Sequence, residues 1–230
     1  MTHQLPLNIQ LNQTATLADF SWGDKPWLQE QLMHTLHGEG ERVLYIWGPP
    51  GCGKSHVLQA CCQTARHAQG SIYLPLDLLH AYGPGILDGI EEQSLIAIDD
   101  LDIIAQNPAW EEAIFHVYNK IRDSGRHCLL LSGTCAPMNM PIRLADLRSR
   151  LSGGLVIQLQ ELPDLEKIKI LQHHAHGRGL TISANVAHFL LRRCTRNLHD
   201  LLQCLNQLDE ASLIAQRKIT IPFVKQVLNL

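Results

Sequence analysis

Short apolar runs alternate with longer stretches of helical periodicity over the first two thirds of the chain. Five runs are short enough to be strands buried on both faces, and they lie at residues 43–47, 71–75, 95–98, 128–132 and 155–159. Three helical patterns precede or separate them, at residues 24–37, 56–69 and 110–124. Because strand and helix alternate, the sequence predicts an α/β domain with a parallel five-stranded sheet.

The pattern changes after Leu162 and Pro163. Four helical patterns follow without any further strand, at residues 164–176, 183–194, 197–215 and 222–229. Residues 1–12 have no helical period, so we expect an extended tail there. The sequence therefore predicts a tail (1–12), an α/β core (13–162) and a small all-helical domain (163–230).

Composition and charge exclude several classes of protein. Hydrophobic residues make up 45% of the 230 residues and charged residues 18%, which is enough for a packed core. The formal net charge of -3 excludes a strongly basic chain that coats nucleic acid by charge alone. The seven cysteines form no C-x-x-C pair, and no signal peptide or membrane span is apparent. We therefore expect a cytoplasmic protein.

A glycine-rich motif lies between the strand run 43–47 and the next helical pattern. It fits G-x-x-x-x-G-K-[ST] at every fixed position, and the cofactor-binding candidates are Gly48, Pro49, Pro50, Gly51, Cys52, Gly53, Lys54, Ser55 and the following His56. The glycines let backbone N–H groups close around phosphate oxygens, and the helix N-terminus adds a positive dipole end. We expect Lys54 to reach the β- and γ-phosphates of ATP or ADP, and Ser55 to ligate Mg²⁺.

Two carboxylates, Asp99 and Asp100, follow the strand run 95–98. At the end of a buried strand downstream of a phosphate loop, Asp99 is expected to hold the Mg²⁺ that Ser55 also contacts. Asp100 is expected to orient an attacking water. Asp102, a third carboxylate nearby, is interpreted as a helix-start residue.

The phosphate loop, the paired aspartates and the trailing helical domain together resemble the AAA+ ATPases. The Asp-Asp variant, with Ser132-Gly-Thr after the next strand, resembles the branch of the bacterial initiator DnaA. The start Gln4-Leu-Pro-Leu and the stretch 215–225 resemble the DnaA-related regulatory inactivators within that branch. The resemblance covers nearly the whole chain and implies an AAA+ P-loop core followed by a helical lid.

The resemblance also implies a role for the N-terminal tail. Gln4, Leu5, Leu7 and Ile9 match the motif that binds the sliding clamp, the beta subunit of DNA polymerase III. In an extended peptide the Gln4 amide offers hydrogen bonds and the apolar side chains fill a groove. Asn8 departs from the pattern, because the family often has a proline there. The alternative is an ordinary frayed N-terminus.

Two arginines carry roles that the resemblance implies. Arg150 matches the family's arginine finger, which reaches the ATP site of a neighbouring subunit, where its planar fork pairs with phosphoryl oxygens. Arg148 could share this role. Arg196 matches the sensor 2 arginine of the lid, which touches the phosphates of the bound nucleotide. The alternatives are a surface arginine on a helix for Arg150 and a solvent-exposed salt bridge for Arg196.

The chain departs from the family after its sensor 1 strand. Thr134 replaces an aspartate in a segment that is usually Gly-Asp-Arg-Pro-Pro, so we expect Ser132 to make the sensor 1 contact. Leu17 and Phe20 match a segment that packs near the adenine, and core packing explains them equally well.

The resemblance implies a regulator of replication initiation. Bound to the DNA-loaded clamp, it would meet DnaA and trigger hydrolysis of DnaA-bound ATP through Arg150, while its own nucleotide is mainly structural. The alternatives are a helicase loader or motor that hydrolyses its own ATP, and a nucleotide-binding module without hydrolysis. A clamp motif suits the first interpretation and has no role in a loader. The acidic balance and an end right after the lid favour no sequence-specific DNA binding. Because AAA+ sites are commonly shared between subunits, we expect a homodimer or a larger oligomer.

Overall fold

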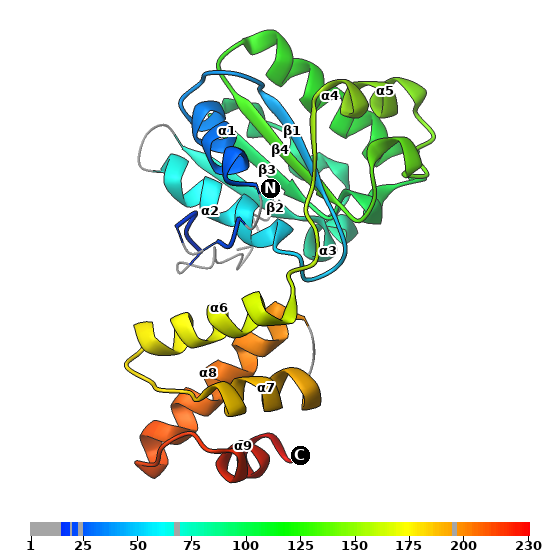
Figure 1. Ribbon diagram of the computed structural model, residues 1–230. Coiled ribbons are helices and arrows are strands. Elements are labelled where there is room, and N and C mark those ends of the chain that lie inside the picture. Colours follow the sequence, from blue (N-terminus) through cyan, green and yellow to red (C-terminus); the bar gives the residue numbers. More distant parts are fainter. Residues whose placement is uncertain (1–14, 19, 23–24, 67–69, 195–196) are drawn as a thin grey trace, which may run out of the picture. The chain divides into compact units, whose positions relative to one another are not determined.

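The computed structural model describes residues 15–18, 20–22, 25–66, 70–194 and 197–230. The chain forms two compact units (Figure 1). One consists of Met1–Gly48 and Lys54–Leu159, and the other of Pro49–Gly53 and Gln160–Leu230. The second unit thus takes in five residues of the phosphate loop, which the sequence placed with the α/β core.

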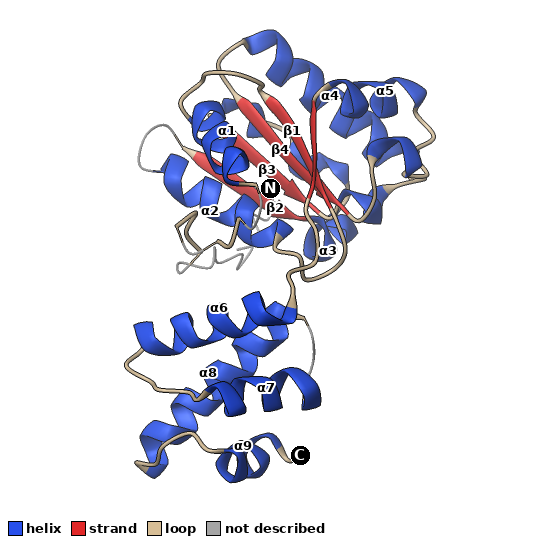
Figure 2. Ribbon diagram, viewed as in Figure 1, coloured by secondary structure: helices blue, strands red, loops and turns tan. Residues whose placement is uncertain are grey.

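The first unit is built on one parallel sheet (Figure 2). Its strands are β1 (Val43–Trp47), β2 (Ser71–Pro75), β3 (Leu95–Asp99), β4 (Cys128–Gly133) and β5 (Leu155–Gln158). They are arranged in the order β2-β3-β4-β1-β5. The predicted five-stranded parallel sheet is therefore confirmed, and the carboxyl ends of β1, β3 and β4 lie at one edge.

Helices cover both faces of the sheet, because alternate strand residues point to opposite sides. The helices are α1 (Pro26–Leu36), α2 (Lys54–Arg66), the short α3 (Leu76–Leu79), α4 (Pro108–Ser124) and α5 (Ala145–Gly153). α2 packs along β2, β3 and β4, and α1 packs on α2. A separate core cluster joins strands to α4 and α5, and it includes Val43, Tyr45, Ile96, Ile98, Trp110, Ile114, Leu147 and Leu151.

Several short elements were not predicted. They are α3, α5 and the 3₁₀ helices η1 (His80–Tyr82), η2 (Pro84–Leu87), η3 (Ile90–Glu92), η4 (Leu101–Ile104) and η5 (Pro137–Asn139). α3 and the 3₁₀ helices, with three or four residues each, are too short to establish a hydrophobic period, and α5 has only two buried apolar residues, Leu147 and Leu151. α2 begins at Lys54, two residues before the predicted start, so Lys54 and Ser55 lie in its first turn.

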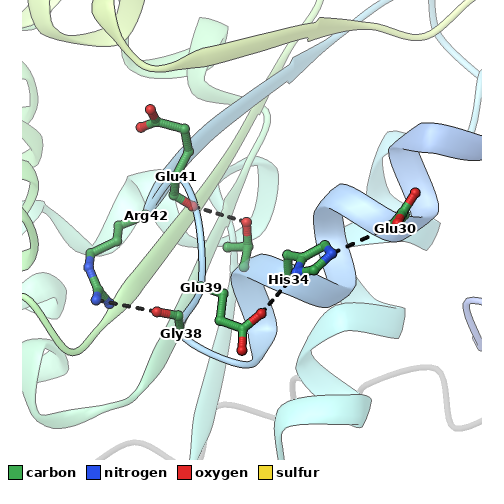
Figure 3. Close-up of polar contacts among 7 residues, drawn as sticks. Glu30, His34, Gly38, Glu39, Glu41 and Arg42 are labelled. Atoms are coloured by element: carbon green, nitrogen blue, oxygen red, sulfur yellow. Dashed lines mark hydrogen bonds and ion pairs between the residues drawn. The ribbon is translucent and has the colours of Figure 1, made fainter.

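Side chains fix the turn between α1 and β1 (Figure 3). His34 Nδ1 lies 2.9 Å from Glu39 Oε2. The buried Thr35 donates its hydroxyl hydrogen to the Glu41 carbonyl at 2.9 Å. These contacts tie the end of α1 to the residues just before β1, the strand that leads into the phosphate loop.

The second unit contains four helices among its described residues. They are α6 (Asp164–Gly177), α7 (Ala184–Arg193), α8 (Leu198–Ala215) and α9 (Ile221–Leu228). Ser183 caps α7 as predicted, since its hydroxyl accepts a hydrogen bond from the Val186 N–H at 3.3 Å. Leu171, Leu190 and Leu205 are fully buried in the core that the helices share. The predicted helical domain is therefore confirmed.

None of the helices in the described part of the chain is both long and apolar enough to cross a membrane.

Candidate nucleotide site

The candidate nucleotide site is built at the carboxyl ends of β3, β4 and β1, which are neighbours in the sheet. Asp99 ends β3, Ser132 lies one residue before the end of β4, and Gly48 follows β1. The Gly48 N–H donates a hydrogen bond to the Gly133 carbonyl at 3.2 Å, which joins the start of the phosphate loop to β4. Ligands of open parallel sheets bind at this edge.

The phosphate loop has the backbone and the charge that a phosphate chain requires. Gly51 and Gly53 have φ values of 78° and 99°, which side-chain-bearing residues rarely adopt. Lys54 is only 6% exposed, and its Nζ donates a hydrogen bond to the Gly48 carbonyl at 3.0 Å. The residues present therefore fit a nucleotide with its divalent cation: glycines of positive φ, a lysine at the loop and the carboxylates at the end of β3.

Asp99 is oriented by hydroxyl groups from both neighbouring strands. It is 1% exposed. The Tyr73 hydroxyl of β2 donates a hydrogen bond to Oδ2 at 2.6 Å, and the Ser132 hydroxyl of β4 donates one to Oδ1. Burial and the Asp99 charge raise the pKa of Tyr73 well above its usual range, so Tyr73 remains a donor. Neither hydroxyl is charged, so they orient the carboxylate without neutralising it.

Ser132 also binds the backbone of Asp100, whose N–H donates to its Oγ at 2.9 Å. Asp100 has φ 58° and ψ 53°, a left-handed conformation that aspartate tolerates better than most residues. Burial, chiefly, and the nearby Asp99 charge raise the pKa of Asp100 to about 6, although Lys54 opposes this shift. A carboxyl with a pKa near neutrality can accept a proton, which suits the predicted role beside an attacking water.

Asp102, interpreted from sequence as a helix-start residue, lies in the first turn of η4, and its carboxylate has a further role. Its carboxylate accepts hydrogen bonds from the Thr134 N–H and the Thr134 hydroxyl, each at 2.7 Å. The loop after β3 is thereby tied to the loop after β4. The one hydroxyl hydrogen of Thr134 is donated to Asp102, and that of Ser132 to Asp99. The sensor 1 contact expected of Ser132 stays a prediction.

The segment before α1 lies against the first turn of α2. His56 Nε2 is 3.0 Å from the Thr16 carbonyl, and the Phe20 ring centroid is 5.8 Å from that of His56. Leu17 is buried, and its carbonyl accepts a hydrogen bond from Trp22 Nε1 at 3.2 Å. Leu17 and Phe20 therefore lie beside the helix that begins with Lys54 and Ser55.

Arg148 and Arg150 lie on α5, which packs on β5 and α4. Lys54 and Asp99 belong to α2 and β3, so the two arginines are on an element that carries no part of the phosphate loop or the acidic motif. Arg148 Nη1 donates to the Ile142 carbonyl at 3.5 Å, and Arg150 is half-buried in the last turn.

The remaining predicted site residues lie outside the described residues, namely Gln4, Leu5, Leu7, Ile9 and Arg196.

Neither Tyr73 nor the hydrogen-bonding role of the Asp102 carboxylate was predicted from the sequence. Tyr73 is 26 residues from Asp99, and only the adjacency of β2 and β3 brings the two together. One signal in the sequence was the Tyr73 hydroxyl on an otherwise largely apolar strand. A buried hydroxyl needs a hydrogen-bond partner, so this residue indicated a polar group on a neighbouring element.

Sequence comparisons identify relatives of both parts of the chain. A family model described as "Hda, lid domain" matches residues 164–228, and one described as "RNA helicase" matches residues 44–122. The second match contains the phosphate loop and the paired aspartates. An uncharacterized protein of Haemophilus influenzae is 40% identical over 231 residues, which cover 100% of both chains.

Solved structures share the fold. Domain III of the Thermotoga maritima replication initiation protein DnaA superimposes with a TM-score of 0.79 at 19% identity, covering 96% of this chain and 98% of that one. AMPPCP-bound DnaA from Aquifex aeolicus superimposes with a TM-score of 0.70 at 22% identity, and the match covers 85% of this chain and 65% of that one. The Thermotoga maritima RuvB Holliday junction branch migration motor superimposes with a TM-score of 0.67 at 19% identity, and the match covers 96% of this chain and 73% of that one. At these identities the likeness shows an AAA+ fold and nothing finer.

Proposed function

Since the chain belongs to the Hda family of DnaA-related AAA+ proteins, we propose that it limits replication initiation by stimulating hydrolysis of the ATP bound to DnaA. The observation that carries this proposal is the location of Arg150 on α5, apart from the elements of the chain's own phosphate loop and acidic motif. Such an arginine would act on the nucleotide of a neighbouring AAA+ subunit, where its planar fork would pair with phosphoryl oxygens. In this proposal that neighbour is DnaA, and hydrolysis inactivates the initiator and prevents re-initiation.

The chain's own site is proposed to hold ADP or ATP with Mg²⁺. Lys54 would contact the phosphates, while Ser55 and Asp99 would hold the cation, which neutralises phosphate charge when bound. The hydroxyl hydrogens of Ser132 and Thr134 are already donated to Asp99 and Asp102. This favours a nucleotide that is held as a structural ligand, with little or no intrinsic ATPase activity.

The N-terminal tail is proposed to bind the sliding clamp of DNA polymerase III through Gln4, Leu5, Leu7 and Ile9. Support comes from the sequence motif alone, since these residues lie outside the described part of the chain. Recruitment to a clamp on DNA would bring the protein to DnaA without DNA recognition of its own. Shared AAA+ sites also make a homodimer or larger assembly part of this proposal.

Phosphate release from ATP-loaded DnaA, mixed with this protein, clamp and DNA, tests the proposal. Stimulation by an arginine finger is worth roughly 10³–10⁵ in rate, or about 4–7 kcal/mol of barrier. Arg150→Ala should abolish the stimulation and leave clamp binding intact, whereas Arg126→Ala, at an exposed loop position, should change neither. The double variant Gln4→Ala/Leu7→Ala should lose clamp binding and keep its fold. Absence of any stimulation, or turnover by this chain alone at a comparable rate, contradicts the proposal and favours a motor.

A further inference from the structure

Glu111 is a carboxylate buried at the start of α4. Sequence alone gives it the appearance of an ordinary first-turn acid, yet it is 1% exposed. Oε1 accepts hydrogen bonds from the Gln106 N–H at 2.7 Å and the Arg143 N–H at 3.1 Å. Oε2 accepts from the Arg143 N–H at 3.0 Å and the Leu144 N–H at 2.8 Å. Three backbone N–H groups from two separate segments therefore converge on this side chain.

Two of these N–H groups belong to the start of α5. The N-cap residue of α5 is Leu144, whose apolar side chain makes no capping hydrogen bond. Backbone N–H groups at a helix start need acceptors, and the positive end of the helix dipole favours a negative charge nearby. Glu111 supplies both from 33 residues away in the chain, so the start of α5 is fixed to α4.

The third N–H group belongs to the loop that leads into α4. Gln106 has φ 69°, a strained conformation for a residue with a side chain. The same loop follows η4, which contains Asp102. Glu111 thus holds together the loop behind the acidic motif and the start of the helix that carries Arg148 and Arg150.

Arg148 and Arg150, the two arginines of α5, differ in the contacts that they make within the chain. The Arg148 guanidinium donates to the Ile142 carbonyl, just before the helix, and the Arg148 carbonyl accepts a hydrogen bond from the Ser152 hydroxyl. Arg148 therefore contributes to the segment's own structure. Leu147 and Leu151, both fully buried, fix the rotation of α5 about its axis. This rotation in turn sets the position of Arg150, which is half-buried in the last turn of the helix.

We propose that Glu111 is a positioning residue that anchors α5 and thereby sets Arg150 for contact with the nucleotide of the neighbouring subunit. The inference rests on the proposed function, because it needs Arg150 to act on that nucleotide. Glu111 itself touches no reacting atom.

The substitution Glu111→Gln tests this role because it keeps the size of the side chain. It replaces one oxygen by an NH₂ group, which cannot accept a hydrogen bond, so in either orientation of the amide at least one of the Gln106 and Leu144 N–H groups loses its acceptor. We expect the maximal rate of stimulated hydrolysis on DnaA to fall roughly tenfold or more, since small misplacements remote from the chemistry lose up to about a hundredfold. The concentration of this protein that gives half the maximal rate should stay unchanged. Glu112→Gln is the matched control, since its side chain is 72% exposed and 3.8 Å from His116.

A double variant separates positioning from general damage. Arg150→Lys keeps the positive charge without the planar fork and should keep a measurable part of the stimulation. If Glu111 acts through Arg150, then Glu111→Gln should have little further effect on the rate in the Arg150→Lys background. Amide hydrogen exchange on the chain alone should be faster at one or more of Gln106, Arg143 and Leu144 in Glu111→Gln, and unchanged in α8. If Glu111→Gln does not fold, Glu111→Asp repeats the assay with the charge kept and the reach shortened.

The outcomes distinguish the two proposals. Full stimulation by Arg150→Ala overturns the proposed function and this inference with it. Loss of stimulation in Arg150→Ala, together with a full rate in both Glu111 variants, overturns the inference alone. So does an equal further loss of rate in the double variant, because Glu111 would then act by another route.

Discussion

The Tyr73 hydroxyl donates a 2.6 Å hydrogen bond to Asp99, and so β2 orients the carboxylate that ends β3. Tyr73→Phe removes this hydroxyl, so Oδ2 of the buried Asp99 carboxylate loses that hydrogen bond. We expect a loss of about 1–3 kcal/mol in the free energy of unfolding, measured by urea denaturation. We also expect several-fold weaker binding of Mg-ADP, measured by calorimetry.

Tyr82→Phe is the control for this change, since Tyr82 is 55% exposed. Equal stability and equal Mg-ADP affinity in Tyr73→Phe and the unmodified chain would show that Ser132 alone suffices to orient Asp99.

Asp100 makes stability depend on pH. Its pKa of about 6 in the folded chain exceeds the ordinary value of 3.8, so the folded state binds the proton more tightly than the unfolded state. Stability is therefore highest below about pH 4 with respect to this group and falls as the pH rises to about 6. The difference between these two pKa values corresponds to about 3 kcal/mol, which water screening of the partly exposed carboxyl reduces to about 1 kcal/mol.

Asp100→Asn should remove this dependence and raise stability at pH 7.5 by about 1 kcal/mol. Asparagine also tolerates the left-handed backbone at this position. Urea denaturation at pH 5 and pH 7.5 measures the difference, with the exposed Asp88→Asn as control. A pH profile that is the same in Asp100→Asn and the unmodified chain would contradict the assignment.

Lys54 lowers the pKa of Asp100, against the larger effects of burial and Asp99. Lys54→Met should therefore raise the pKa of Asp100 above about 6, which NMR titration of the carboxyl resonances in the nucleotide-free chain measures. The same variant should lose Mg-ADP binding. Lys120→Met, a change at an exposed lysine of α4, should do neither. If the pKa of Asp100 is the same in Lys54→Met and in the unmodified chain, then the Lys54 charge does not act on Asp100 and the prediction is wrong.

The hydrogen bonds between Thr134 and Asp102 predict that a second substitution can restore the stability lost in a first. Thr134→Asp would place a second carboxylate where the Thr134 hydroxyl now lies 2.7 Å from an Asp102 oxygen. We expect a loss of about 1 kcal/mol at pH 7, because like charges repel and a hydrogen bond is lost. Adding Asp102→Asn should restore most of it. Denaturation of both variants at low and high salt measures the effect, and a double variant no more stable than the single one would refute it.

The sheet could be predicted because its strands are apolar on both faces, and the lid because its helices are long enough to show a period. α5 could not, since only Leu147 and Leu151 are apolar and buried on its nine residues. Phosphate-loop chemistry was readable from sequence, because its residues are consecutive. Tyr73 and Glu111 act on partners 26 and 33 residues away, which only the packed fold brings to them.

The pairing of Asp102 with Thr134 also bears on how such chains diverge. An aspartate at position 134 and the present aspartate at position 102 are poorly compatible, so the two positions are expected to change together in descent. A chimera that takes residues 128–144 from a relative with aspartate at position 134 should accordingly take the relative's residues 99–102 as well.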